Sequence, residues 1–91
     1  MSIEQRLDPV LLLRLAGVSL YGLHWAGPLA KALETSPRNI YRWGSGRAPV
    51  PRELPQKLLS LCENRRQSLM TVATLLVDYE LRRVDSLKKE E

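Results

Sequence analysis

The sequence of 91 residues lacks phenylalanine altogether and has one cysteine and one histidine. Cys62 therefore has no partner for an intramolecular disulfide or a cysteine metal cluster, and we expect its thiol to be reduced and buried. His24 has no second histidine with which to form a metal site or a pH-sensitive pair. We expect no bound metal and no cofactor.

Signals for β-structure are missing as well. Apolar and polar residues nowhere alternate with a period of two, and the hairpin dipeptides Asn-Gly and Asp-Gly do not occur. The chain does have 44% hydrophobic residues, mostly leucine, valine and alanine, which suffices for one small helical core. The sequence therefore predicts a single all-α domain over residues 1–91, with four to five helices of which the last is long.

Long apolar runs are also absent. The longest apolar-leaning stretch, residues 69–77, is too short to span a bilayer, and Arg14 interrupts the apolar segment near the N-terminus, unlike in a signal peptide. No serine, cysteine or histidine is arranged as an activated nucleophile, and no glycine-rich loop follows a strand pattern. We expect a cytoplasmic protein that is not an enzyme, has no catalytic residue, and has neither a membrane nor a small-molecule ligand as a partner.

Acidic residues are missing from one particular window. The formal net charge is +4 and the pI is about 9.6, which favours an anionic partner. Between Glu34 and Glu53 there is no acidic residue. The same window contains the arginines Arg38, Arg42, Arg47 and Arg52. Because the basic excess is concentrated there, we expect the anionic partner to bind at this part of the chain.

Residues 26–45 have the pattern of two short helices joined by a tight turn. The apolar stripe of the first helix is formed at helical spacing by Ala26, Leu29, Ala30 and Leu33. Ser36 is a favoured N-cap, and Pro37 suits the first position of the second helix, where its missing N–H costs nothing. Gly46 supplies the left-handed residue that commonly ends a helix.

The second of these helices has two different faces. At about 100° per residue, one side carries Pro37, Ile40, Trp43 and Gly44 and is expected to face the core. The other side carries Arg38, Tyr41, Arg42 and Ser45 and is expected to face solvent. A short helix with an apolar back and a cationic front fits the major groove of double-stranded DNA.

This segment resembles the helix-turn-helix of the Cro/CI-type repressor family, also called the XRE or lambda-repressor-like family. The matching residues are Leu29, Ala30, Leu33, Ile40, Trp43 and Gly46. Residues 20–25 and 47–51 resemble a subgroup of small bacterial regulators, so that the resemblance covers about residues 9–66. The chain departs from the family at Glu34, where glycine is usual because the backbone angle φ is positive. It also has Ala26 and Gly27 where a phosphate-contacting glutamine is common.

The resemblance implies sequence-specific binding of double-stranded DNA by a transcriptional repressor, with residues 37–45 in the major groove. The expected DNA-contacting residues are Ser36, Pro37, Arg38, Asn39, Tyr41, Arg42, Ser45, Arg47, Arg52, His24 and Trp25. Arg42 is the best candidate to read a guanine through O6 and N7, while Arg47 and Arg52 suit phosphates. Tyr41 can donate to a phosphate or contact a thymine methyl group. Trp25 is more often a core residue than a DNA contact in such a position.

Residues 8–66 form the expected DNA-binding core. The expected elements are helices over residues 9–21, 25–33 and 37–45, a proline-containing connector over residues 47–51, and a fourth helix that begins near residue 51 or 52. Leu54, Leu58 and Leu61 of this fourth helix are expected to close the core. Residues 1–7 are expected to be a loosely held lead-in, and the last residues, 88–91, a frayed end.

Residues 67–91 are expected to extend the fourth helix beyond the core. The residues of an apolar stripe on this extension are Leu69, Val72, Leu76 and Tyr79. Because such a stripe needs a cover, we expect it to form a homodimer, and packing back onto the first helix is the alternative. A symmetric dimer would meet two half-sites about one helical turn, roughly 34 Å, apart. A second hypothesis is a protein-binding adaptor or antitoxin whose C-terminal helix binds a different protein.

Overall fold

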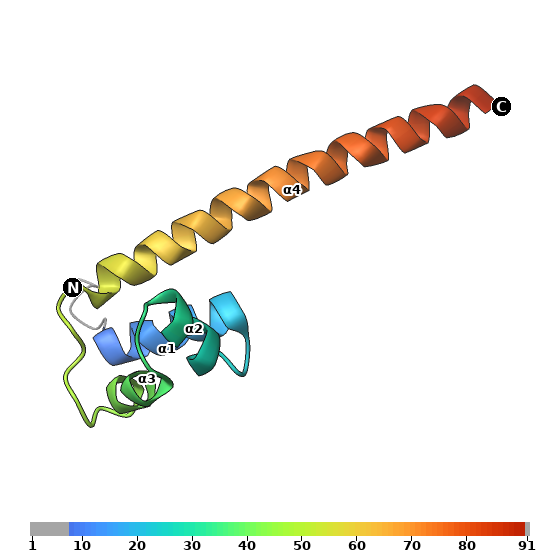
Figure 1. The fold of residues 1–91 in the computed structure, drawn as a ribbon. Coiled ribbons are helices and arrows are strands. Elements are labelled where there is room, and N and C mark those ends of the chain that lie inside the picture. Colours follow the sequence, from blue (N-terminus) through green and yellow to red (C-terminus); the bar gives the residue numbers. More distant parts are fainter. Residues whose placement is uncertain (1–7, 91) are drawn as a thin grey trace.

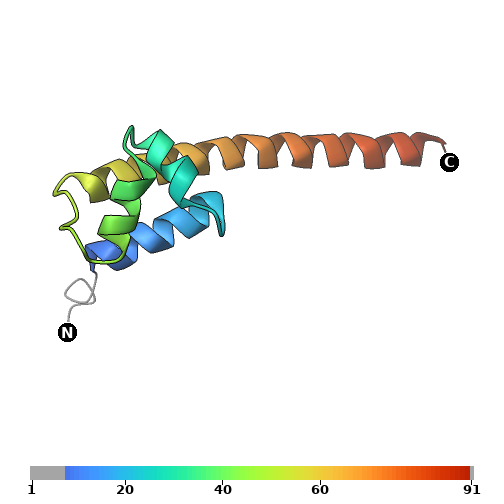
Figure 2. The same cartoon turned by 60° about the horizontal axis from the view of Figure 1, so that its bottom comes forward.

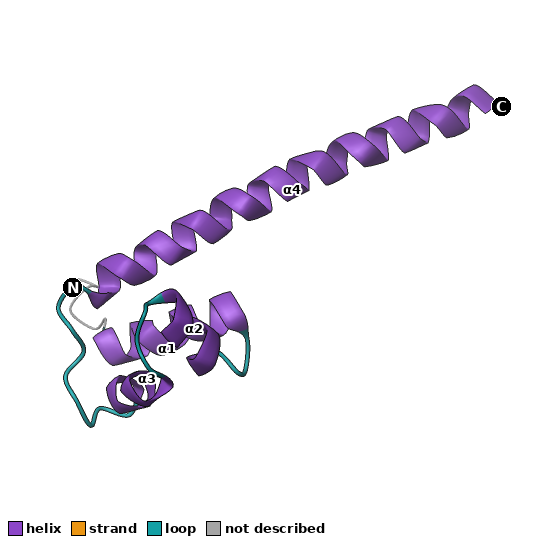
Figure 3. Ribbon diagram, in the orientation of Figure 1, coloured by secondary structure: helices purple, strands orange, loops and turns teal. Residues whose placement is uncertain are grey.

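Four helices account for nearly all of the structure (Figures 1 and 3). The computed structural model describes the backbone of residues 8–90 and the side chains of residues 8–87, so the expected lead-in over residues 1–7 lies outside the described residues. Of the expected frayed end over residues 88–91, residues 88–90 are instead helical and residue 91 lies outside the described residues. The helices are α1 (Pro9–Tyr21), α2 (Ala26–Ala32), α3 (Pro37–Gly44) and α4 (Leu54–Glu90). The prediction of an all-α fold with a long last helix is confirmed, and residues 8–90 contain no strand.

Side-chain caps explain where α1 and α3 begin. The Asp8 carboxylate accepts a hydrogen bond from the Val10 amide at 3.0 Å, and the Ser36 hydroxyl accepts one from the Asn39 amide at 3.2 Å. In both helices a proline occupies the first turn, where an amide has no helical acceptor. Both starts are where the sequence predicts them.

The start of α4 differs slightly from the prediction. The helix begins at Leu54, and Arg52 and Glu53, expected near its start, lie in a turn. The Leu54 amide donates to the Pro51 carbonyl at 3.1 Å, which closes that turn. Proline disfavours helical backbone in the residue before it, so Pro51 and Pro49 keep this segment extended. Helical structure then begins only after the turn.

The core is small and entirely apolar. The side chains of Leu13, Leu29 and Ile40 are completely or almost completely buried, one each from α1, α2 and α3. Leu54 and Leu58 close the core from α4, as predicted. Since α1 packs against each of the other helices, it is the element that holds the fold together.

Trp25 fills the junction between α1 and α3. A Cβ atom added to Gly17 would lie 2.5 Å from Cδ2 and 2.9 Å from Cζ3 of the Trp25 indole, so the ring lies directly on the backbone of α1. Another atom of the same six-membered ring, Cη2, lies 3.8 Å from the position of a Cβ on Gly44. Gly17 therefore makes room for the indole on α1, whereas a Cβ on Gly44 would only be in ordinary contact with it. The structure thus favours the core role for Trp25 over a DNA contact.

The turn between α2 and α3 contains the backbone conformation expected at residue 34. Glu34 has a positive φ of 56°, in the left-handed region that glycine adopts at no steric cost. The Thr35 amide donates to the Ala30 carbonyl at 2.9 Å, which satisfies a free carbonyl at the end of α2. The short turn fixes how α3 leaves α2.

Beyond about residue 62, α4 runs away from the other helices into solvent (Figure 2). The stripe residues Leu69, Val72, Leu76 and Tyr79 are all at least half exposed. The alternative in which this stripe packs back onto α1 is therefore wrong for the single chain. Cys62, expected to be buried, is only partly so, because it lies where α4 separates from α1.

Arg65 anchors the root of this projecting segment. Its guanidinium donates to the Leu20 carbonyl at 2.9 Å and lies over the Tyr21 ring at 5.5 Å from the ring centre. Both contacts are at the C-terminal end of α1, where a positive charge is favourable.

Among the described residues no single helix is long and apolar enough to cross a membrane, although α1 and α2, bent by 97°, meet that criterion when they are taken together.

Candidate nucleic-acid interface

The two faces of α3 are arranged largely as the sequence predicts. Ile40 is 1% exposed, Trp43 packs partly buried against the core, and Gly44 is buried. The opposite face exposes Arg38, Tyr41, Arg42 and Ser45 to solvent. Pro37, expected on the core side, is exposed, because it occupies the first turn of α3 beyond the edge of the core.

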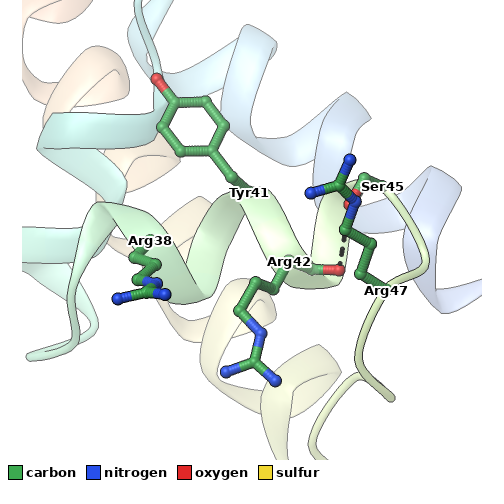
Figure 4. Close-up of a pocket in the computed structure, with 5 residues that line it drawn as sticks. All are labelled: Arg38, Tyr41, Arg42, Ser45 and Arg47. Atoms are coloured by element: carbon green, nitrogen blue, oxygen red, sulfur yellow. Dashed lines mark hydrogen bonds between the residues drawn. The ribbon is translucent and has the colours of Figure 1, made fainter.

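The exposed side chains of α3 line a shallow cavity together with Arg47. This arginine hollow has a volume of about 620 Å³ and is lined by Arg38, Tyr41, Arg42, Ser45 and Arg47 (Figure 4). Arg38 and Arg42, one helical turn apart, extend to the same side of α3, while the Tyr41 ring projects to the other side. The cavity is therefore cationic on one flank and aromatic on the other.

The Arg42 carbonyl holds the segment after α3 in place. It accepts hydrogen bonds from the Ser45 hydroxyl at 3.3 Å and from the backbone amides of Arg47 at 2.9 Å and Ala48 at 3.2 Å. Gly46, with φ of 78°, provides the left-handed residue that this reversal requires. The backbone of Arg42 thus fixes Arg47 beside α3, and the side chains of both residues line the hollow.

The arginines of the hollow have no carboxylate partner within the described residues. All the ion pairs there lie along α4, between Glu63 and Arg66, between Asp78 and Arg82, and between Glu80 and Arg83. Arg38 and Arg42 are therefore like charges one turn apart, an arrangement that costs an isolated helix a few tenths of a kcal/mol, roughly 0.2–0.5. An anion bound in the hollow would relieve this repulsion.

A second hollow lies at the start of α2 and shares Tyr41 with the first. This α2 hollow has a volume of about 310 Å³. Its lining residues are Leu23, His24, Trp25, Ala26, Gly27, Pro28 and Tyr41. The first amides of a helix lack helical acceptors, and a Cβ on Gly27 would meet nothing within 4 Å, so the backbone here is accessible. Sequence reasoning did not single out Leu23, which is 88% exposed at this rim.

Three of the predicted contact residues are placed less favourably. The Ser36 hydroxyl is used as the N-cap of α3, and the Asn39 side-chain amide donates to the Thr35 hydroxyl at 2.8 Å. Arg52 is exposed but lines neither hollow. It follows the connector, next to a different cavity whose lining includes the carboxylates of Glu34 and Glu53.

The structure therefore brings together one group of predicted residues on a continuous surface: Arg38, Tyr41, Arg42, Ser45 and Arg47 in one hollow, with His24 and the edge of Trp25 in the next. No family model, no curated protein and no solved structure matches the chain. This surface and the resemblance of the α2–α3 segment are therefore the features that bear on function.

Proposed function

We propose that the protein binds double-stranded DNA in a sequence-specific manner and acts in the cytoplasm as a transcriptional repressor. The single observation that carries the proposal is the arginine hollow on α3, whose cationic side chains face solvent without an ion-pair partner among the described residues. A helix about 10–12 Å across enters a major groove about 12 Å wide. Buried Ile40 and Trp43 hold α3 by its opposite face, so that the reading side chains stay outside the core.

In the proposed complex Arg42 reads a base and its neighbours bind the DNA backbone. Arg42 lies near the middle of the hollow and can donate in a bidentate manner to O6 and N7 of guanine. Arg38, one turn earlier, and Arg47, beside the end of α3, line the same hollow and in this proposal contact phosphates on either side. Tyr41, which lines both hollows, contacts either a thymine methyl group or a phosphate.

The start of α2 supplies a further phosphate contact in this proposal. The family-typical glutamine is absent, but the α2 hollow is lined by His24 and Gly27 at the start of α2 and is joined to α3 through Tyr41. Amides at the start of a helix are suited to an anion. Trp25 contributes indirectly, because its indole sets the position of α2 relative to α3 through Gly17 and Gly44.

The proposed repressor acts as a homodimer formed by the projecting part of α4. Leu69, Val72, Leu76 and Tyr79 lie exposed on this segment. A contiguous apolar surface of this kind on a soluble domain commonly marks an interaction site. Bound to two half-sites, the dimer would block a promoter by occupying it.

A selection from a random duplex pool, followed by affinity measurements on the selected site, tests this proposal. Arg42→Ala is expected to weaken specific binding by about 1–3 kcal/mol and to relax the preference at one base pair. Arg82→Ala, which removes the same charge from the polar side of α4, is the matched control and should leave the affinity nearly unchanged. Wild-type affinity for Arg42→Ala at every salt concentration would refute the proposed role of α3.

A further inference from the structure

The projecting part of α4 has a face whose chemistry is symmetric about Ala73. The residues of this face, spaced three or four apart, are Leu59, Cys62, Arg66, Leu69, Ala73, Val77, Glu80, Val84 and Leu87. At about 100° per residue they all project within about 40° of the direction of Ala73. We call this set the Ala73 face.

The symmetry is visible when residues at equal distances before and after Ala73 are compared. Leu69 corresponds to Val77, and Cys62 corresponds to Val84, so small or medium apolar side chains match in both pairs. Leu59 likewise corresponds to Leu87. The remaining pair, seven residues before and seven after Ala73, is Arg66 with Glu80, which have opposite charges.

The face is open in the single chain. The exposed fractions are 61% for Leu69, 59% for Val77 and 41% for Val84. Two shallow hollows meet at Ala73: one of about 480 Å³ that extends towards Cys62 and the end of α1 at Leu20, and one of about 410 Å³ that extends to Leu81. The small side chain of Ala73 thus leaves space at the centre of the face for another backbone to approach.

We propose that two copies of the chain pair through the Ala73 face as antiparallel α4 helices, with the two-fold axis at Ala73. This inference specifies the geometry of the homodimer in the proposed function, and it rests on the proposed homodimer alone and not on the proposed DNA binding. In a two-fold interface the same surface is used by both copies, so each residue must be complementary to the one at the mirrored position. Antiparallel pairing centred on Ala73 meets this condition at every position of the face.

Charge decides between the antiparallel and the parallel arrangement. Antiparallel pairing places Arg66 of one copy opposite the partner's Glu80, twice in the dimer. A parallel pair in register would instead place Arg66 against Arg66 and Glu80 against Glu80, and like charges across an interface are strongly unfavourable. Glu63 and Arg83, which pair with Arg66 and Glu80 along the same helix, lie about 80° from the direction of Ala73 and outside the face.

The same pairing gives the hollow at the end of α1 an occupant. The hollow is lined by Leu20 of α1 and by Cys62, Leu69 and Met70 of α4. In the antiparallel pair the partner's segment from Val77 to Leu87 lies over it. The projecting helix of one copy would then contact both α1 and α4 of the other copy. This double contact accounts for the width of the apolar arc on α4, which is more than a single partner helix would cover. Val72, Leu76 and Tyr79 lie about 60–120° around α4 from the centre of the face, on one flank of this contact.

Disulfide trapping in the full-length protein tests the orientation. Cys62 is expected to lie opposite the partner's residue 84, so Val84→Cys under mild oxidation should give a dimer linked between Cys62 and position 84, as mapped by peptide mass spectrometry. Within one chain these positions are about 33 Å apart along the helix, so the bond can form only between chains. Arg82→Cys, on the opposite side of α4, is the control and should not link to Cys62.

Two results of the trapping experiment would overturn the inference: links between two Cys62 residues, and links between two residues 84. A protein that is monomeric at every concentration in analytical ultracentrifugation would also overturn it. That third result is the one expected if α4 instead binds a different protein. Arg42→Ala should leave the Cys62 link intact. A failure of DNA binding therefore leaves this inference standing, and a failure of the link leaves the proposed DNA contacts of α3 untouched.

A charge-reversal series gives an independent measurement. Arg66→Glu and Glu80→Arg alone each create like pairs at two symmetric places and should raise the dimer dissociation constant by about tenfold to a hundredfold. The double variant restores opposite charges and should return it to within about threefold of wild type. In a parallel pair each single variant would only exchange one pair of like charges for another, so an unchanged dissociation constant in both single variants would contradict the antiparallel arrangement. Circular dichroism of each variant checks that α4 remains helical.

Discussion

Replacing Gly17 by alanine should destabilise the protein, although alanine is the better helix former. In the interior of a helix Gly→Ala normally stabilises by about 1 kcal/mol. Here the new methyl group would lie 2.5 Å from Cδ2 of the Trp25 indole, whereas carbon atoms in good contact are about 3.5–4.0 Å apart. The same six-membered ring also lies near Gly44 of α3, because its Cη2 is 3.8 Å from where a Cβ on Gly44 would be.

The two contributions can be compared directly. Forcing an extra methyl group into a well-packed site costs about 1–3 kcal/mol, so after the gain of about 1 kcal/mol the net effect of Gly17→Ala is a loss of up to about 2 kcal/mol. For a domain of this size that corresponds to a melting temperature lower by up to about 16 °C. Gly27→Ala is the matched control, since its Cβ would meet nothing within 4 Å, and it should leave the melting temperature unchanged or raise it slightly.

Thermal unfolding followed by circular dichroism, at one protein concentration for all variants, measures both effects. If Gly17→Ala proves as stable as Gly27→Ala, the close packing of Trp25 on α1 is not what holds these helices together. A double-mutant cycle with Trp25→Ala sharpens the test. Once the indole is removed, Gly17→Ala should become neutral or stabilising, and the difference between the two backgrounds is the coupling energy.

Further predictions concern the caps, the strained turn and the phosphate contacts. Ser36→Ala removes the N-cap of α3 and should cost about 1 kcal/mol of stability in chemical denaturation, with Ser60→Ala on exposed α4 as the control; equal stability of the two variants would contradict the capping role. Glu34→Gly relieves the positive φ and should stabilise by about 1 kcal/mol, whereas a melting temperature at or below that of wild type would show that the residue is not strained. Arg47→Ala should weaken binding to all duplexes alike and reduce the slope of log affinity against log salt by about one, and an unchanged slope would exclude a phosphate contact.

The sequence predicts the local features of this fold well because they depend on near neighbours. The cap is predicted from Ser36 and Pro37, because a hydroxyl there lies next to free amides at the start of a helix. The two faces of α3 are predicted from the helical period, which separates Ile40 and Trp43 from Arg38 and Arg42. The caps and the directions of Ile40, Trp43, Arg38 and Arg42 are confirmed for these reasons. The positive φ at residue 34 agrees with what the family resemblance implies and not with a local pattern.

What the sequence did not indicate depends on contacts between distant residues. Nothing local marks Gly17 as the surface on which Trp25 packs, because the glycine looks like a weak point of α1 until the indole is placed against it. From the sequence, Asn39 is as available to DNA as its neighbours, but in the structure its side chain is hydrogen-bonded to Thr35. Likewise Arg52 belongs to the same basic window as the other arginines, but the connector places it outside the arginine hollow. The symmetry about Ala73 is present in the sequence, but it gains meaning only when α4 is seen to leave the core as one uninterrupted helix.

The position of Trp25 has a consequence for how the binding surface can change. One indole touches α1 at Gly17, approaches α3 at Gly44 and forms part of the rim at the start of α2. The outward side chains of α3 take no part in that junction. Arg38, Tyr41 and Arg42 can therefore be exchanged to alter what is recognised while the scaffold keeps its geometry, whereas an alteration at Trp25 shifts both hollows at once.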